Sequence, residues 1–75
     1  MGFIDTAYDA AWLYGLCVDA DWCLRDGLLT IESSDHVLLV WYGYWRHMEY
    51  NGRGSEVRCV TGVSADGLLA EMERF

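Results

Sequence analysis

The chain has 75 residues, of which twelve are Asp or Glu and five are Arg, with no Lys, so its formal net charge is −7. Hydrophobic residues make up 53% of the chain, which excludes an acidic disordered tail, because disorder requires low hydrophobicity together with high net charge. The few cations argue against direct nucleic-acid binding, since phosphate contacts need clustered Lys and Arg. We expect a single domain over residues 1–75.

Helical periodicity is present near both ends of the chain. Apolar residues recur at steps of three and four near the N-terminus, which predicts a helix over residues 4–17 with one buried stripe. The stripe consists of Ile4, Ala7, Tyr8, Ala11, Trp12, Gly15 and Leu16. Near the C-terminus, Ser64 is a favourable N-cap, and Leu68 and Met72 follow at helical spacing. These residues predict a second helix over residues 65–74.

The residue types between the two helices favour β-structure. Residues 28–33 and 56–61 have the composition of strands, and β-branched and aromatic residues dominate the stretch 37–50 between them. Ser34-Asp35 and Asn51-Gly52 are turn sequences at the two boundaries, and Asn-Gly is the stronger hairpin signal. The pattern predicts a three-stranded antiparallel meander.

The segment before the first predicted strand is open to two interpretations. Asp26-Gly27 is a turn signal, so residues 22–25 fit either a short strand or an irregular bridge. With the helices at either end, the predicted order is α-β-β-β-α. The expected fold class is α+β, a compact single domain in which two helices pack on the meander.

The strand registers predict which residues share a face, if both turns have two residues. The first turn pairs Ile31 with Leu38, and the second pairs Tyr44 with Cys59. One face, the expected core, collects Leu29, Ile31, Leu38, Val40, Tyr42, Tyr44, Val57 and Cys59. The reverse face collects Thr30, Glu32, Val37, Leu39, Trp41, Trp45, His47, Glu56 and Arg58.

Part of the reverse face is apolar, and its exposure depends on where the helices pack. If one helix covers each face, no patch remains. If both helices pack on the core face, a contiguous apolar surface is left open, and such surfaces usually mark interaction sites. In that case we expect Val37, Leu39, Trp41 and Trp45 to bind a partner or to form a homodimer.

No motif in the sequence indicates catalysis or a cofactor. Cys17, Cys23 and Cys59 are an odd number, which excludes a closed disulfide framework, and the five residues between the first two are more than zinc knuckles have. No nucleophile elbow, HExxH, P-loop or dinucleotide fingerprint accompanies His36 or His47. We therefore expect no enzyme activity, no cofactor and no metal site.

The sequence predicts a cytoplasmic protein without a membrane span. It has no run of 18 apolar residues, and its first residues lack the basic region and the apolar stretch of a signal peptide. Free thiols fit a reducing compartment.

Acidic residues concentrate in the first third of the chain. Five aspartates precede residue 27, namely Asp5, Asp9, Asp19, Asp21 and Asp26. A field of this sign steers association toward basic surfaces, and spaced carboxylates can stand where phosphates would. We expect these five residues to form a partner-binding face, with Tyr14 and Trp22 as aromatic anchors.

In size, acidity and element order, the whole chain resembles the anti-CRISPR proteins of phages and mobile elements. Those are short, often acidic single domains that bind CRISPR effector complexes, and several act as nucleic-acid mimics. The family shares no sequence motif, so the resemblance assigns no residue roles. It implies an inhibitor that occupies a basic nucleic-acid site of an effector complex, blocks target DNA binding and acts in the cytoplasm of a host bacterium.

Two other functions fit the same sequence. An antitoxin or immunity protein would use the same acidic side chains to neutralise a basic nuclease. A homodimeric structural protein would instead be joined through the apolar sheet face. Salt separates the charge-driven alternatives from the apolar one, because only charge-driven association weakens steeply with ionic strength.

Overall fold

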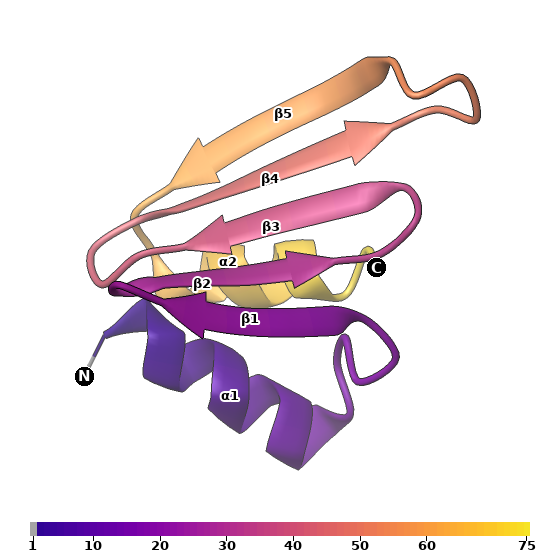
Figure 1. The fold of residues 1–75 in the computed structure, drawn as a ribbon. Helices are drawn as coiled ribbons and strands as arrows, with labels where there is room; N and C mark the ends of the chain where they lie inside the picture. Colours follow the sequence, from indigo (N-terminus) through magenta and orange to yellow (C-terminus); the bar gives the residue numbers. More distant parts are fainter. Residues whose placement is uncertain (1) are drawn as a thin grey trace.

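The computed structural model describes residues 2–75 as a five-stranded antiparallel sheet with two helices (Figure 1). The elements are α1 (Phe3–Tyr14), β1 (Asp21–Arg25), β2 (Leu28–Glu32), β3 (His36–Val40), β4 (Trp45–Tyr50), β5 (Glu56–Gly62) and α2 (Ala65–Met72). The strands pair in the order β1-β2-β3-β4-β5, which is an uninterrupted meander. The predicted α+β single domain is confirmed, but the sheet has five strands rather than three.

Two tight turns create the additional strands. Asp26 and Gly27 both have positive φ, 52° and 79°, as a type I′ hairpin turn requires, so the segment before them pairs as β1. The second turn lies within the predicted strand 37–50. There the Trp41 amide donates to the Tyr44 carbonyl at 2.9 Å, and the chain reverses between β3 and β4.

Both helices pack on the same face of the sheet. A single buried cluster joins residues of α1, β2, β3, β4 and α2: Ala7, Ala10, Leu29, Ile31, Leu38, Val40, Trp45, Leu68 and Met72. The inward residues alternate along the strands, as a pleated sheet requires. Within residues 2–75, no helix covers the opposite face of the sheet, which we call the open face.

Helix α1 is shorter than predicted and turns a different side to the sheet. It ends at Gly15, which has φ 68° and whose amide donates to the Ala11 carbonyl, a common helix C-cap. The buried residues are Ala7 and Ala10, whereas Trp12 is 86% exposed. The predicted stripe is therefore right for Ala7 and wrong for Trp12. The two alanines allow a close approach of α1 that a buried indole would prevent.

Helix α2 agrees with the prediction at its start. The Ser64 hydroxyl accepts a hydrogen bond from the Gly67 amide at 3.1 Å, and Leu68 and Met72 are buried. The helix ends at Met72, two residues before the predicted boundary. Neither helix of the described chain is long and apolar enough to cross a membrane.

Of the two predicted hairpin registers, the first is confirmed and the second is wrong. The turn at Ser34-Asp35 gives the expected pairing, with Ile31 opposite Leu38. The predicted two-residue turn at Asn51-Gly52 is wrong, because the connection is a five-residue loop over 51–55, in which the Asn51 side-chain oxygen accepts from two backbone amides. A bulge between the strands also shifts their pairing.

The new register reverses the faces assigned to β4 and β5. Trp45 is 3% exposed and belongs to the core, so it is not part of an exposed sheet face as predicted. His47 is buried beside it, and Arg58 also lies on the helix-covered face. The residues wrongly assigned to the core are exposed: Tyr42, Tyr44, Val57 and Cys59.

Trp45 connects the sheet to the start of α2. Its indole Nε1 donates to the Ser64 carbonyl at 2.9 Å. The ring lies against two glycines, Gly62 at the end of β5 and Gly67 in the first turn of α2. A Cβ atom at Gly67 would lie 2.8 Å from the Trp45 ring, so the indole occupies space that any larger residue would need.

We expect Gly67→Ala to destabilise the protein, although alanine at an exposed helix position usually stabilises by about 1 kcal/mol. The added methyl group would displace the Trp45 ring and strain the Ser64 cap. Gly52→Ala is the matched control, because a Cβ there meets nothing within 4 Å. Urea unfolding followed by tryptophan fluorescence measures both. A Gly67→Ala variant as stable as the Gly52→Ala variant would contradict this packing.

Candidate functional site

The five aspartates predicted to bind a partner belong to two neighbouring elements, α1 and β1, and to the segments that flank β1. Asp5 and Asp9 are on α1, Asp19 and Asp21 flank the start of β1, and Asp26 is in the turn after β1. Figure 1 draws strand β1 next to helix α1, and the rings of Tyr8 and Trp22, with 5.1 Å between their centroids, join the two elements. Because β1 has five residues at about 3.3 Å each, the carboxylates spread over the length of the strand. We call these five residues the acidic edge.

Within residues 2–75 none of the five aspartates forms an ion pair, although Arg25 directly precedes Asp26. Residues 1–24 contain no Arg, Lys or His. All ion pairs within the described chain involve other residues: His47, Glu49, Arg58, Glu71 and Arg74. All five aspartates are exposed. Their negative charge therefore faces solvent.

Aromatic and apolar side chains accompany the acidic residues on α1. Asp5, Asp9 and Trp12 follow one another at steps of four and three and so lie on one outer side of the helix. Tyr8 is on the same side and is also exposed. Leu13, Tyr14 and Val18 add exposed apolar surface nearby. This side of α1 combines charge with aromatic surface, which is typical of protein interfaces.

The two aromatic anchors expected from the sequence differ in exposure. Tyr14 is exposed, as expected. Trp22 is half-buried, because its indole Nε1 donates to the Cys17 carbonyl at 2.8 Å and its ring contacts Tyr8, with 5.1 Å between the ring centroids. Trp22 therefore packs against α1 and the loop that follows it. Trp12, which the sequence placed inside, has the exposure that an anchor needs.

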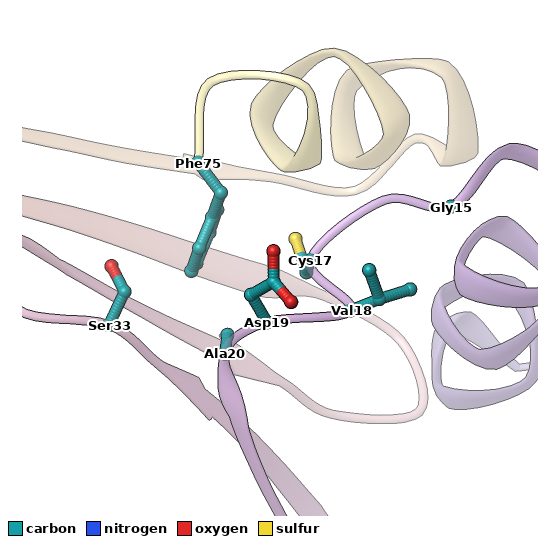
Figure 2. A pocket seen from close by; sticks show the side chains of 7 residues that line it. All are labelled: Gly15, Cys17, Val18, Asp19, Ala20, Ser33 and Phe75. Atoms are coloured by element: carbon teal, nitrogen blue, oxygen red, sulfur yellow. The ribbon is translucent and has the colours of Figure 1, made fainter.

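The loop between α1 and β1 borders a hollow of about 290 Å³ (Figure 2). Asp19 lines it together with Cys17, and Phe75 stands on the opposite side. The Cys17 thiol donates to the Met72 carbonyl, and burial raises the pKa of this thiol to about 11. A thiol with so high a pKa stays protonated, so Cys17 is not a nucleophile at neutral pH.

The open face carries three of the four residues predicted for a sheet interface. Val37 and Leu39 are half-buried on β3, and Trp41 follows at the strand end, stacked on Tyr44 with 4.3 Å between ring centroids. Trp45 is on the other face. Trp41 also lines a shallow hollow with residues of β1 and β2. The predicted set therefore lacks Trp45 on the open face.

The helix-covered face contains a buried polar network that sequence reasoning missed. His47 is completely buried, and its Nδ1 lies 2.8 Å from the Glu71 carboxylate of α2. Its Nε2 lies 3.0 Å from Nδ1 of His36 on β3. Arg58 donates to both oxygens of Glu71 from its two terminal nitrogens, to Oε2 at 2.9 Å and to the same Oε1 that His47 contacts. Strands β3, β4 and β5 are thereby tied to α2.

Glu49 extends the network toward solvent. It accepts hydrogen bonds from Arg58 at 2.6 Å and from Arg74 at 2.7 and 3.0 Å. The Phe75 ring covers the pair of imidazoles, with centroids 4.9 Å from His36 and 5.1 Å from His47. Two carboxylates and two guanidinium groups balance in charge, which is how buried ions are accommodated in proteins.

The protonation states of the network follow from its contacts. Hydrogen bonds from Arg74 lower the pKa of Glu49 to about 2, and hydrogen bonds from Arg58 lower the pKa of Glu71. Burial lowers the pKa of His47 despite the adjacent Glu71 carboxylate. Neutral His47 therefore donates its Nδ1 proton to ionised Glu71, and its bare Nε2 accepts the Nδ1 proton of His36.

This geometry was not visible in the sequence because it depends on register. The predicted pairing of Tyr44 with Cys59 would put His47 opposite Glu56, whereas the structure puts His47 opposite Val60 and Glu49 opposite both His36 and Arg58. The only available signal was the charge of Glu71 within an otherwise apolar stripe of α2.

Oxygen and nitrogen atoms of His36, His47 and Glu49 lie within 4.8 Å of one another, so these three residues are able to hold a metal ion.

A scan against protein-family models found no match to this chain, and searches of curated proteins and of solved structures found none either.

The network predicts loss of stability in acid. His47 has a pKa below its ordinary 6.5 in the folded state, so its contribution is complete above pH 6.5 and is lost as the pH falls below it. Glu71 has a pKa below its ordinary 4.5, so its contribution is lost at still lower pH. We expect the free energy of unfolding to be level from pH 8 to 7 and to fall in two stages on acidification.

Chemical denaturation at a series of pH values, with a chelator present, measures both stages. His47→Gln removes the imidazole that causes the first stage and leaves the second. A wild-type protein that becomes more stable between pH 7 and pH 5.5 would contradict the network. So would a His47→Gln variant that retains the first stage.

Proposed function

We propose that the protein is a non-enzymatic inhibitor that binds a basic, nucleic-acid-binding surface of a partner protein through the acidic edge and the outer side of α1. The expected partner is a CRISPR effector complex, whose binding to target DNA would be blocked. The observation that carries this proposal is the position of Trp12, 86% exposed on the same side of α1 as Asp5 and Asp9.

The two kinds of side chain have different roles in such a complex. Unpaired carboxylates accelerate encounter with a basic surface and select it over neutral or acidic ones. Aromatic side chains supply the affinity, because a large indole buried at an interface contributes far more than a charge at its rim. Trp12 is therefore the proposed anchor, and the acidic edge the proposed source of specificity.

The distribution of cations supports this assignment. Arg58 and Arg74 are bound to Glu49 and Glu71, so they do not oppose a basic partner at the acidic edge. Arg25 lies at the end of β1 and is the one cation in the first third of the chain. A cationic groove approaching α1 would consequently meet carboxylates and aromatic rings, as it would meet phosphates and bases on a nucleic acid.

An acidic antitoxin or immunity protein remains the second candidate, because the same edge would fit a basic nuclease. The partner distinguishes these two functions, since their physics is shared. A homodimer through Val37, Leu39 and Trp41 is favoured by the lack of a helix over the open face within the described residues. It needs no contribution from the acidic edge.

The first test measures DNA binding by purified CRISPR effector complexes of several types, using fluorescence anisotropy of a labelled target DNA. We expect the protein to inhibit at least one complex, and Asp5→Asn with Asp9→Asn to weaken inhibition about tenfold at low salt. Glu56→Gln with Glu73→Gln is the matched control, because it removes the same charge from exposed positions outside the acidic edge.

Inhibition should also weaken steeply when ionic strength rises from about 50 to about 200 mM. If no effector complex is inhibited, the expected partner is wrong, and inhibition of a basic nuclease alone would support the antitoxin function. Equal weakening by the two double variants would contradict a role for the acidic edge.

The second test is Trp12→Ala in the same assay. Since Trp12 makes little contact within the fold, we expect its loss to leave the unfolding midpoint unchanged within experimental error and to weaken inhibition by about 2 kcal/mol or more. Leu13→Ala, which also removes an exposed apolar side chain from α1, is the comparison and should have a smaller effect. Full inhibition by Trp12→Ala would exclude the proposed anchor.

A further inference from the structure

The polar network contains three side chains whose arrangement fits a metal ion. His36 and Glu49 are direct cross-strand partners on β3 and β4, and His47 is two residues before Glu49 on the same face. One nitrogen or oxygen atom from each of the three lies within 4.8 Å of the others. The site is independent of the acidic edge, because none of its members belongs to that edge.

The distance between the facing nitrogens of the two imidazoles is close to the distance between two ligand atoms of one ion. Two ligand nitrogens at about 2.05 Å from a tetrahedral ion are about 3.3 Å apart. Nδ1 of His36 and Nε2 of His47 are 3.0 Å apart, so a small opening of this pair admits the ion. His36 need only move its proton from Nδ1 to Nε2, which keeps the imidazole neutral and frees a lone pair for coordination.

The surroundings of His47 are those of a metal ligand. Histidine ligands commonly donate a hydrogen bond from the N–H of their second ring nitrogen to a carboxylate. This bond fixes the tautomer and the orientation of the ring. Glu71 accepts from Nδ1 of His47 at 2.8 Å and is itself held by Arg58. Phe75 stacks against both imidazoles and shields this side of the pair from water. Glu71 is thus a positioning residue.

Glu49 would reach the ion in competition with Arg74. Its Oε2 atom lies 3.9 Å from Nδ1 of His47, the nitrogen that donates to Glu71, so it must turn toward Nε2 to share an ion, and both of its oxygens now accept from Arg74. The Arg74 side chain is about half exposed, so it can turn into solvent while Glu49 coordinates. The end of α2 is beside the site, and the partial negative charge of a helix C-terminus favours a cation there.

We propose that His36, His47 and Glu49 bind one divalent transition-metal ion, oriented by Glu71, and that this ion clamps β3 and β4 at the end of α2. Two imidazoles and one carboxylate are the ligand types that Zn²⁺ accepts, and they leave a fourth position for water. The ion stabilises the folded state, since the unfolded chain does not hold these ligands together.

Isothermal titration calorimetry with Zn²⁺ alone tests the site in a Cys23→Ser, Cys59→Ser background, which removes the two exposed thiols. We expect one ion per chain and a higher unfolding temperature with Zn²⁺ than with a chelator. His36→Gln should weaken the affinity at least about tenfold. Asp35→Asn is the matched control, because it changes an exposed acidic neighbour outside the ligand set and should leave the affinity unchanged.

Arg74→Gln removes one of the two guanidinium groups that compete for Glu49, leaving Arg58 in place, and should increase Zn²⁺ affinity. If Glu49 acted only through its charge, it would not need to exchange Arg74 for the ion. A second measurement therefore follows the ring ¹⁵N chemical shifts of both histidines. Zn²⁺ should move the signals of His36 Nδ1 and His47 Nε2, whether or not His36→Gln folds.

Absence of Zn²⁺ binding, or undiminished binding by folded His36→Gln, overturns the site. Unmoved histidine ¹⁵N signals at saturating Zn²⁺ overturn it as well. An affinity that stays the same or falls in Arg74→Gln overturns Glu49 as the third ligand.

Discussion

Burial on one side of the sheet is the constraint on which the other features of this protein depend. Both helices pack on the face formed by Leu29, Ile31, Leu38 and Val40, and they also contact each other. With so few residues, only one apolar layer can be completed. The helices therefore share a single core. One side of α1 and the open face of the sheet remain in contact with solvent.

Strand β4 joins this core to α2 at two points along its length. Trp45 reaches the start of the helix through its hydrogen bond to Ser64 and its contact with Gly67. His47, two residues later, reaches the last turn through Glu71. The apolar contact and the polar contact lie on the same side of the strand. Their spacing makes the orientation of α2 a consequence of the β4 register.

The charges of the protein are used in two separate ways. In the network, Arg58 and Arg74 neutralise Glu49 and Glu71, and this pairing makes burial of His47 tolerable. Among the residues that the structure describes, the aspartates of the acidic edge have no such partners, so their field extends into solvent. A net charge of −7 therefore belongs mainly to the surface outside the network. The proposed inhibitor function uses the edge, and the proposed metal site uses the network.

The sequence alone predicted the α+β class, both helices, the Ser64 cap and the first hairpin register, because each depends on local periodicity or on a short turn. It did not determine the reversal at Trp41–Tyr44, since aromatic residues are compatible with both a strand and a turn. It did not determine the loop over 51–55 either, since Asn51-Gly52 fits a longer hairpin loop as well as a two-residue turn. A shift of register moves every side chain of a strand to a new partner or face. Tertiary packing therefore decided that Trp45 and His47 are buried, that Trp12 is exposed, and that two histidines and two glutamates meet beneath α2.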